Sequence, residues 1–272
     1  MMSRRVFLKV SATTAAASTV PIGCTTMASD ITAQVEHRPW PLPDTRWLLL
    51  MRWHDLLFAH WPVNVESIRP LIPKLVEIDT FDDSAWIGIV PFHMSGVRPR
   101  YVPVPLAFPE LNVRTYVKYR GKSGVWFFSL DAASWLAVRG GRWLGLPYYN
   151  ARMAVQVKGD VVEYESMRTH SNSRTAELSA RYGPTSPPYY SAPGTFDHWL
   201  TERYALYAAL NPERVVFGEI HHVQWPLQRA EVELRKNTMG TALGVELPGT
   251  KPICHFARYQ EVVAWPIVEI SG

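Results

Sequence analysis

The stretch ELNVRTYVKY, at positions 110–119, restricts the fold most because its residues alternate in the manner of a β-strand. In a strand, Glu110, Asn112 and Arg114 share one face, whereas Leu111 and Val113 share the other. The following RGKSG is typical of a turn, and VWFFSL then predicts an apolar strand that runs back. The chain must therefore contain an antiparallel hairpin with a row of polar groups on one face.

Similar strand-like segments recur along most of the chain. YYNARMAVQV and VVEYESMRTH flank a Gly159-Asp160 turn, and Asp82-Asp83 predicts another hairpin turn. The 11 tryptophans and 22 prolines favour strands with many turns around an aromatic interior over a helical bundle. We predict a mainly β (α+β) fold, with one domain at 47–272 and a polar, proline-rich linker at 29–46.

Three segments predict helices outside the strands. Asn64 is placed to cap a short one, and Asp131 is placed to cap the helix AASWLAVRGGRWLG. Pro147 forbids continuation of that second helix. The segment FDHWLTERYALYAAL, at 196–210, has the spacing of a third.

The amino terminus resembles an export signal. SRRVFLK, at positions 3–9, resembles the twin-arginine export signal at every position, and the apolar run at 10–22 is too short to span a bilayer. We predict that residues 1–28 are a signal peptide and that the chain folds before export to the periplasm. Cleavage after Ala28 is one reading. The other is a lipobox, PIGC, with Cys24 as lipid acceptor and hence a membrane anchor, although Pro21 departs from that pattern.

The distribution of charged residues argues against a nucleic-acid partner. The net charge is +4, but Arg4, Arg5 and Lys9 all lie in the leader, and the remaining 25 basic residues nearly balance 24 acidic ones. Apart from Cys24 the chain has one cysteine, Cys254 in an apolar run, which predicts a buried, inert thiol.

Several long blocks carry a family resemblance. LLFAHWPV, FPELNVRTYV, GLPYYNARM, GEIHHVQWPLQ and HFARYQEVVAWP resemble the DUF2071, or YqjF-like, family across about residues 38–270. That family name supplies no reaction. The family is in turn similar to the acetoacetate decarboxylase-like fold, which implies an antiparallel β-barrel or double sheet, open at one end, with a few packed helices.

The resemblance can be carried over residue by residue. Glu110 matches the strand glutamate that faces the pocket, Gly141-Arg142 matches a Gly-Arg near a helix end, and Gly145-Leu146-Pro147 matches the Gly-x-Pro before the reactive position. The decarboxylases place their Schiff-base lysine directly after that proline, with a second lysine beside it. Here Tyr148 and Tyr149 stand at the two positions, and tyrosine forms no imine. Schiff-base decarboxylation is therefore not expected.

The polar face of strand 110–119 is the first candidate site. If it looks into a barrel, Arg114 can hold a carboxylate, Asn112 can bind beside it, and Glu110 can act as acid or base once burial raises its pKa. The alternative is a solvent-facing strand, or a buried Glu–Arg pair that satisfies itself. Lys118, on the same face, is roughly 26 Å from Glu110 at the rise of a strand, and we interpret it as an exposed lysine at the strand end.

Glu219 and His221 form the second candidate site because they share a strand face and could serve general acid–base chemistry. The alternative for His221 is a hydrogen-bonded structural histidine. A metal site would need His54, His60, His93 or His255 to converge, and neither a metal motif nor a phosphate-binding or Gly-x-Ser-x-Gly loop occurs, so we predict no metal and no cofactor.

Together these patterns predict a protein that binds a small organic molecule, a carboxylate or carbonyl compound, in an aromatic-lined pocket. A hydrolase, isomerase or lyase without a covalent lysine is the alternative, and a structural protein whose barrel is filled by its own aromatic side chains is the third reading. The oligomeric state stays open. The candidate residues divide into a catalytic and a substrate-binding set: Glu110, Tyr148 and His221, and then Asn112, Arg114, Trp126 and Tyr149.

Overall fold

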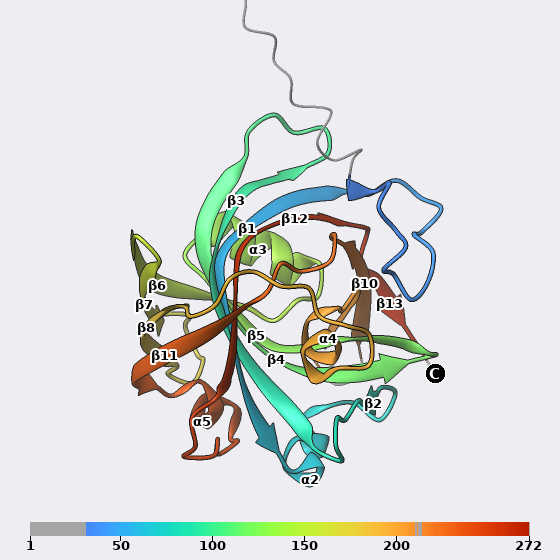
Figure 1. Ribbon diagram of the computed structural model, residues 1–272. Coiled ribbons are helices and arrows are strands. Elements are labelled where there is room, and N and C mark those ends of the chain that lie inside the picture. The colour runs from blue at the N-terminus through green and yellow to red at the C-terminus, as the bar shows by residue number, and fades with distance from the viewer. Residues whose placement is uncertain (1–30, 210, 212–213, 272) are drawn as a thin grey trace, which may run out of the picture.

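The computed structural model describes residues 31–209, 211 and 214–271, and strands dominate it (Figure 1). The signal peptide and the lipobox at Cys24 lie outside these residues. The strands are β1 (Leu49–Val63), β2 (Glu77–Ile78), β3 (Ala85–Pro99), β4 (Leu106–Tyr119), β5 (Lys122–Ala132), β6 (Tyr148–Lys158), β7 (Val161–Arg168), β8 (Glu177–Pro184), β9 (Ala205–Ala209), β10 (Val215–His221), β11 (Gln228–Asn237), β12 (Ile253–Ala264) and β13 (Val268–Ile270). The helices are α2 (Val65–Ile68), the 3₁₀ turn η1 (Arg69–Leu71), α3 (Trp135–Trp143), α4 (Phe196–Thr201) and α5 (Met239–Leu243).

Seven of the strands pair in a closed ring. The order β10-β9-β5-β4-β3-β1-β12 returns to its start because β10 pairs with β12 as well as with β9. This last ladder is thin, since only Ile220↔Ala264 and His221↔Val263 make it up. We call this arrangement the seven-strand ring.

A second sheet covers one side of the ring. β6 leaves β5 by a short parallel pairing, β7 and β8 follow antiparallel, and β11 returns to β12 through Gln228↔Phe256 and Arg229↔His255. In Figure 1 these four strands lie on the left, away from β10 and β13. The predicted mainly β fold with a double sheet and few helices is confirmed.

Strand alternation divides the core into two compartments. One cluster lies between the ring wall and the second sheet and includes Leu111, Val113 and Trp126. The other occupies the ring interior and draws on all seven strands. Its members include Phe58, Phe92, Phe108, Ala132, Leu206, Ile220 and Ala257. Because successive side chains of a strand point to opposite faces, the alternation in β4 decides which residues reach the interior.

Two helix predictions need correction. α3 is capped by Ser134, whose side chain accepts from the Ala137 amide, whereas Asp131 belongs to β5. The expected helix at 196–210 ends at Thr201, and Ala205–Ala209 forms β9 between β5 and β10. Filling that gap in the ring satisfies the backbone of β9 on both sides, which outweighs the local helical spacing.

The expected hairpin at Asp82-Asp83 is much smaller than predicted. Both residues have positive φ, 48° and 59°, and the turn joins only Phe81 and Ser84 in a single bridge. The adjoining strand β2 pairs instead with β4.

The segment 31–46, which we predicted to be a linker, packs against the domain. Arg38 is buried, and its guanidinium donates to the Ile220 carbonyl and to Glu219. The Trp40 indole donates to the same carboxylate. We call residues 31–46 the N-terminal strap.

Candidate functional site

Glu110 and Tyr148 meet inside the seven-strand ring. Glu110 lies on β4 opposite Phe92 and Ala132, both members of the interior cluster. The Tyr148 hydroxyl donates to Oε2 of Glu110 at 2.8 Å. Burial raises the pKa of the Glu110 carboxyl to about 8, although the bond from Tyr148 opposes this shift. The carboxyl group is therefore mostly protonated at neutral pH.

The turn before β6 directs Tyr148 inward. Gly145 has a φ of +88°, and a Cβ there would lie 2.8 Å from Val216, so only glycine suits this position. At Gly141 a Cβ would lie 2.2 Å from the Tyr148 ring, so the missing side chain makes room for the phenol. Arg142 then donates from Nη1 to the Tyr148 carbonyl oxygen at 2.9 Å. These contacts give a physical reason for the Gly-Arg and Gly-x-Pro pattern.

Asn112 and Arg114 follow Glu110 along the same face of β4. The Oδ1 atom of Asn112 and the Nε atom of Arg114 are buried and have no hydrogen-bond partner. The Arg114 guanidinium lies 5.3 Å from the centroid of Phe58 and 5.9 Å from that of Tyr116.

Arg114 differs from three buried arginine side chains of the described chain. The side chains of Arg38, Arg168 and Arg203 are 1%, 5% and 5% exposed, and each forms an ion pair, with Glu219, Asp131 and Asp79 respectively. Within the residues that the structure describes, no carboxylate lies within ion-pair distance of Arg114. A partly buried cation without a counter-ion is costly unless something else supplies the anion.

Aromatic rings form the wall beside these polar groups. Trp53 stacks on Trp225 at 6.0 Å between centroids, and Phe58 and Phe92 contact them edge-on at 5.1 and 5.7 Å. The indole nitrogens of Trp53 and Trp225 are buried without an acceptor. Buried polar atoms normally find partners, so unpaired donors in one compartment indicate a place for water or a ligand.

The structure does not bring Trp126 or Tyr149 to this compartment. Trp126 packs into the cluster on the outer face of the ring wall. Tyr149 follows Tyr148 directly and therefore points to the other face of β6, where the Arg168 guanidinium lies 4.1 Å from its ring centroid. Arg168 there forms two hydrogen bonds with Asp131, at 2.6 and 2.7 Å.

His221 also lies apart from Glu110. Its neighbour Ile220 points into the ring, so His221 faces outward beneath the N-terminal strap. It donates from Nε2 to the Ile31 carbonyl at 2.7 Å, accepts from Arg38, and stacks on His37. Burial lowers the pKa of His221 to about 4. This is the arrangement of a hydrogen-bonded structural histidine.

The sequence analysis did not predict one polar cluster, which is centred on Asp197. His255 on β12 is fully buried and donates from Nε2 to Asp197 of α4 at 2.9 Å. Tyr189 donates to the other carboxylate oxygen at 2.8 Å, and Arg229 forms an ion pair with it. The bond from His255 is the main reason that the pKa of Asp197 falls to about 2. His255 and Asp197 are 58 residues apart, and no sequence spacing signals their pairing.

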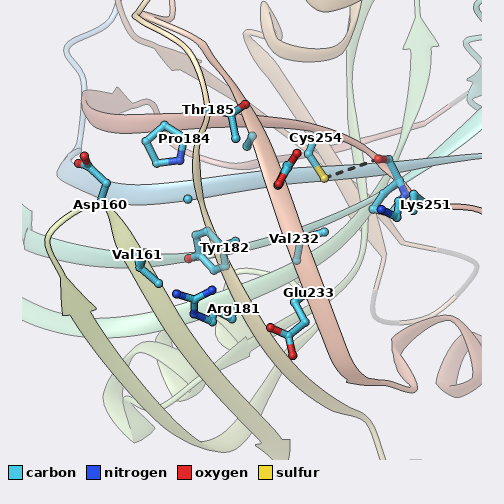
Figure 2. Close-up of a pocket in the computed structure, with 14 residues that line it drawn as sticks. Asp160, Val161, Arg181, Tyr182, Pro184, Thr185, Val232, Glu233, Lys251 and Cys254 are labelled. Carbon is cyan, nitrogen blue, oxygen red and sulfur yellow. Dashed lines mark hydrogen bonds between the residues drawn. The ribbon is translucent and has the colours of Figure 1, made fainter.

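A separate cleft opens where β11 parts from β12. Figure 2 shows its lining, which includes Arg181 and Glu233 on one side and Lys251 and Cys254 on the other, and its volume is about 380 Å³. Neither this cleft nor a more open hollow at Pro62–Val65 includes Glu110 or Tyr148. Arg181 is already paired with Glu163, and burial raises the pKa of the Cys254 thiol to about 12, which makes it a poor nucleophile.

Two further features can be stated for the described residues only. They contain no group of three or more His, Cys, Asp or Glu side chains arranged to hold a metal ion. None of their helices has the length and apolar character needed to cross a membrane.

Comparison with solved structures places the fold. The enduracididine biosynthesis enzyme MppR complexed with pyruvate covers 84% of this chain and 91% of its own, with a TM-score of 0.58 and 11% identity. Acetoacetate decarboxylase from Legionella pneumophila covers 88% of this chain and 96% of its own, with a TM-score of 0.54 and 14% identity. The acetoacetate decarboxylase-like architecture is therefore confirmed, and at these identities the likeness concerns the fold alone.

Sequence comparison identifies the family. The uncharacterized protein YqjF of Bacillus subtilis is 43% identical over 241 residues, which span 87% of this chain and 98% of that protein. Residues 50–261 match the family DUF2071, described as an uncharacterized conserved protein. The resemblance inferred from the sequence blocks is thus confirmed, and the chain belongs to the DUF2071 family.

Proposed function

We propose that this protein binds a small organic acid or carbonyl compound inside the seven-strand ring. Arg114 supplies the positive charge for a carboxylate, and Glu110 with Tyr148 forms a hydrogen-bonding pair for an oxygen of the ligand. The single observation that carries the proposal is the Arg114 guanidinium, which lacks the carboxylate partner that Arg38, Arg168 and Arg203 possess.

The chemistry of the Glu110–Tyr148 pair supports an oxygen-bearing ligand. A carboxyl group with a pKa of about 8 keeps its proton at neutral pH and can donate it in a hydrogen bond. A carbonyl or hydroxyl oxygen is the matching acceptor. The fold neighbour MppR, complexed with the keto acid pyruvate, belongs to the same chemical class of binder.

A non-covalent enzyme is the second candidate, and the raised pKa of Glu110 favours it. A carboxyl that titrates near neutral pH can both take and give a proton, as a hydrolase, isomerase or lyase requires. Tyr148 would then donate a hydrogen bond to the oxygen that gains negative charge. His221, Trp126 and Tyr149 have no part in this proposal because they face away from the ring interior.

The test of binding starts from the purified protein. Native mass spectrometry checks for a copurified small molecule, and calorimetry with pyruvate and acetoacetate measures affinity. We expect Arg114→Gln to weaken binding of these acids about tenfold or more, because it removes a charge-assisted contact. The matched control is Arg181→Gln in the separate cleft, which should bind as the wild type does. Equal binding by wild type and Arg114→Gln, with both folded by circular dichroism, would refute the proposal.

We also propose that the chain is exported folded by the twin-arginine route, on the strength of SRRVFLK at positions 3–9. Replacing Arg4 and Arg5 together by lysine should retain the protein in the cytoplasmic fraction, whereas Lys9→Arg should not. Cytoplasmic protein in the wild type and in both variants would refute export. Incorporation of labelled palmitate that is lost in Cys24→Ala would identify the lipidated form, and its absence would leave cleavage near Ala28.

A further inference from the structure

We propose that the ligand is an elongated amphipathic acid. One end is a carboxylate at Arg114, the other is a hydroxyl or carbonyl oxygen at Glu110 and Tyr148, and the middle is an apolar stretch of several carbons. This inference rests on the proposed function and specifies the substrate class of the same site.

The first argument is the separation of the two polar ends. Glu110 and Arg114 are four residues apart on one strand face, which corresponds to roughly 13 Å between their Cα atoms. The Arg114 guanidinium lies within 5.9 Å of the Tyr116 ring centroid, and Tyr116 is two residues farther from Glu110. Because the two groups are this far apart along the strand, we infer that a two- or three-carbon acid is too short to contact both ends.

The second argument is the continuous aromatic strip between those ends. Phe92 is the β3 partner of Glu110, and the Arg114 guanidinium lies 5.3 Å from the centroid of Phe58. Trp53 and Trp225 connect these two rings through contacts of 5.7, 6.0 and 5.1 Å between successive centroids. A ligand that lies along this strip gains free energy from apolar carbons, about 0.8 kcal/mol for each buried methylene.

The third argument is the length of the span between the two polar ends. Asn112 Oδ1 and the indole nitrogens of Trp53 and Trp225 are buried without partners. Asn112 lies midway between Glu110 and Arg114 on β4, and beside an apolar chain its oxygen is left for a water molecule to pair with. An extended chain of about eight carbons covers roughly 10 Å, which is comparable with the roughly 13 Å between the two Cα atoms.

The experiment is a calorimetric series of ω-hydroxy acids: 3-hydroxypropanoate, 6-hydroxyhexanoate, 8-hydroxyoctanoate and 12-hydroxydodecanoate. We expect affinity to rise about tenfold or more from the shortest acid to 8-hydroxyoctanoate and then to stop rising. Arg114→Gln should weaken 8-hydroxyoctanoate about tenfold but leave 1,8-octanediol unchanged. Tyr148→Phe should weaken 8-hydroxyoctanoate more than octanoate, which has no terminal oxygen.

The outcomes separate this inference from the proposed function. If pyruvate binds as tightly as 8-hydroxyoctanoate and both depend on Arg114, the function stands and the chain-length inference is wrong. If no acid depends on Arg114, both are wrong. A wild-type crystal soaked with 8-hydroxyoctanoate avoids reliance on variants: the carboxylate must lie at Arg114 and the terminal oxygen at Tyr148. Density elsewhere overturns the inference.

Discussion

At the scale of single residues, the Glu110 carboxyl shows how the fold controls the charge state of a side chain. It is buried against Phe92 and Ala132, and its side-chain donor is the Tyr148 hydroxyl. The neutral acid is the stable form there, because one phenol does not replace the water that an ionised carboxylate loses.

Replacing Glu110 by glutamine tests this charge state. The folded-state pKa of about 8 is above the ordinary carboxyl value. The contribution of the protonated Glu110 to the free energy of unfolding is therefore fully present below about pH 4.5 and is lost as the pH rises through 8. We expect Glu110→Gln to be nearly neutral at pH 5 and more stable than wild type by a few kcal/mol at pH 9, measured by urea denaturation. Glu233→Gln, in the separate cleft, is the control. Parallel stability curves for wild type and Glu110→Gln would contradict the assignment.

Imine chemistry gives a second test at this scale. Tyr148 occupies the position that follows Gly-x-Pro, and the nearby lysines have other roles: Lys118 pairs with Asp79 and Lys122 with Glu219. We therefore expect no mass increase when the protein is treated with acetoacetate and borohydride. A stable adduct on a single lysine would overturn the exclusion of Schiff-base catalysis.

Alternation in the sequence was enough to place Glu110, Asn112 and Arg114 on one face of β4. The same rule explains why Tyr149 and His221 lie elsewhere, since each is the direct neighbour of a residue that points into the ring. Which face of β6 or β10 would be interior depends on pairings with distant strands, and that information is absent from the local pattern.

At the scale of elements, α4 shows how tertiary pairing overrides local spacing. The helical pattern at 196–210 predicted one long helix, but the ring needs a strand between β5 and β10, and Ala205–Ala209 supplies it. The remaining short helix α4 is held to β12 through Asp197 and His255. Its Leu200 packs inside the ring against Trp86 and Tyr116.

Asp197→Asn tests this attachment of α4. The pKa of Asp197 is depressed to about 2. The contribution of the ionised Asp197 carboxylate to the free energy of unfolding is therefore present above the ordinary carboxyl pKa near 4 and is lost as the pH falls toward 2. Because Asp197 is partly exposed, we expect a loss of about 1–2 kcal/mol at pH 6 and a much smaller one at pH 2.5. Asp160→Asn, at an exposed ion pair with Arg258, should change stability by less than about 0.5 kcal/mol. A pH-independent loss in Asp197→Asn would rule out the ionic explanation.

At the scale of the whole molecule, the thinnest part of the ring lies beneath the N-terminal strap. β10 and β12 share only two paired positions. The strap adds bonds at this point: Arg38 donates to the Ile220 carbonyl and His221 donates to the Ile31 carbonyl. The proline-rich, polar composition of this segment predicted a linker. Composition alone does not show that Arg38 and Trp40 bind partners far along the chain.

The strap should therefore be part of the folded domain in energetic terms. Removing residues 1–30 leaves these contacts intact, and we expect the free energy of unfolding to be unchanged. Removing residues 1–46 deprives Glu219 of Arg38 and Trp40, leaving Lys122 as its partner at 2.5 Å. It also exposes the apolar surface around Val263 and Trp265. Loss of buried ion-pair partners alone costs about 3 kcal/mol, so urea denaturation should separate the two truncations clearly. Equal stability of both would show that the ring closes without the strap, through its two-residue ladder and side-chain packing alone.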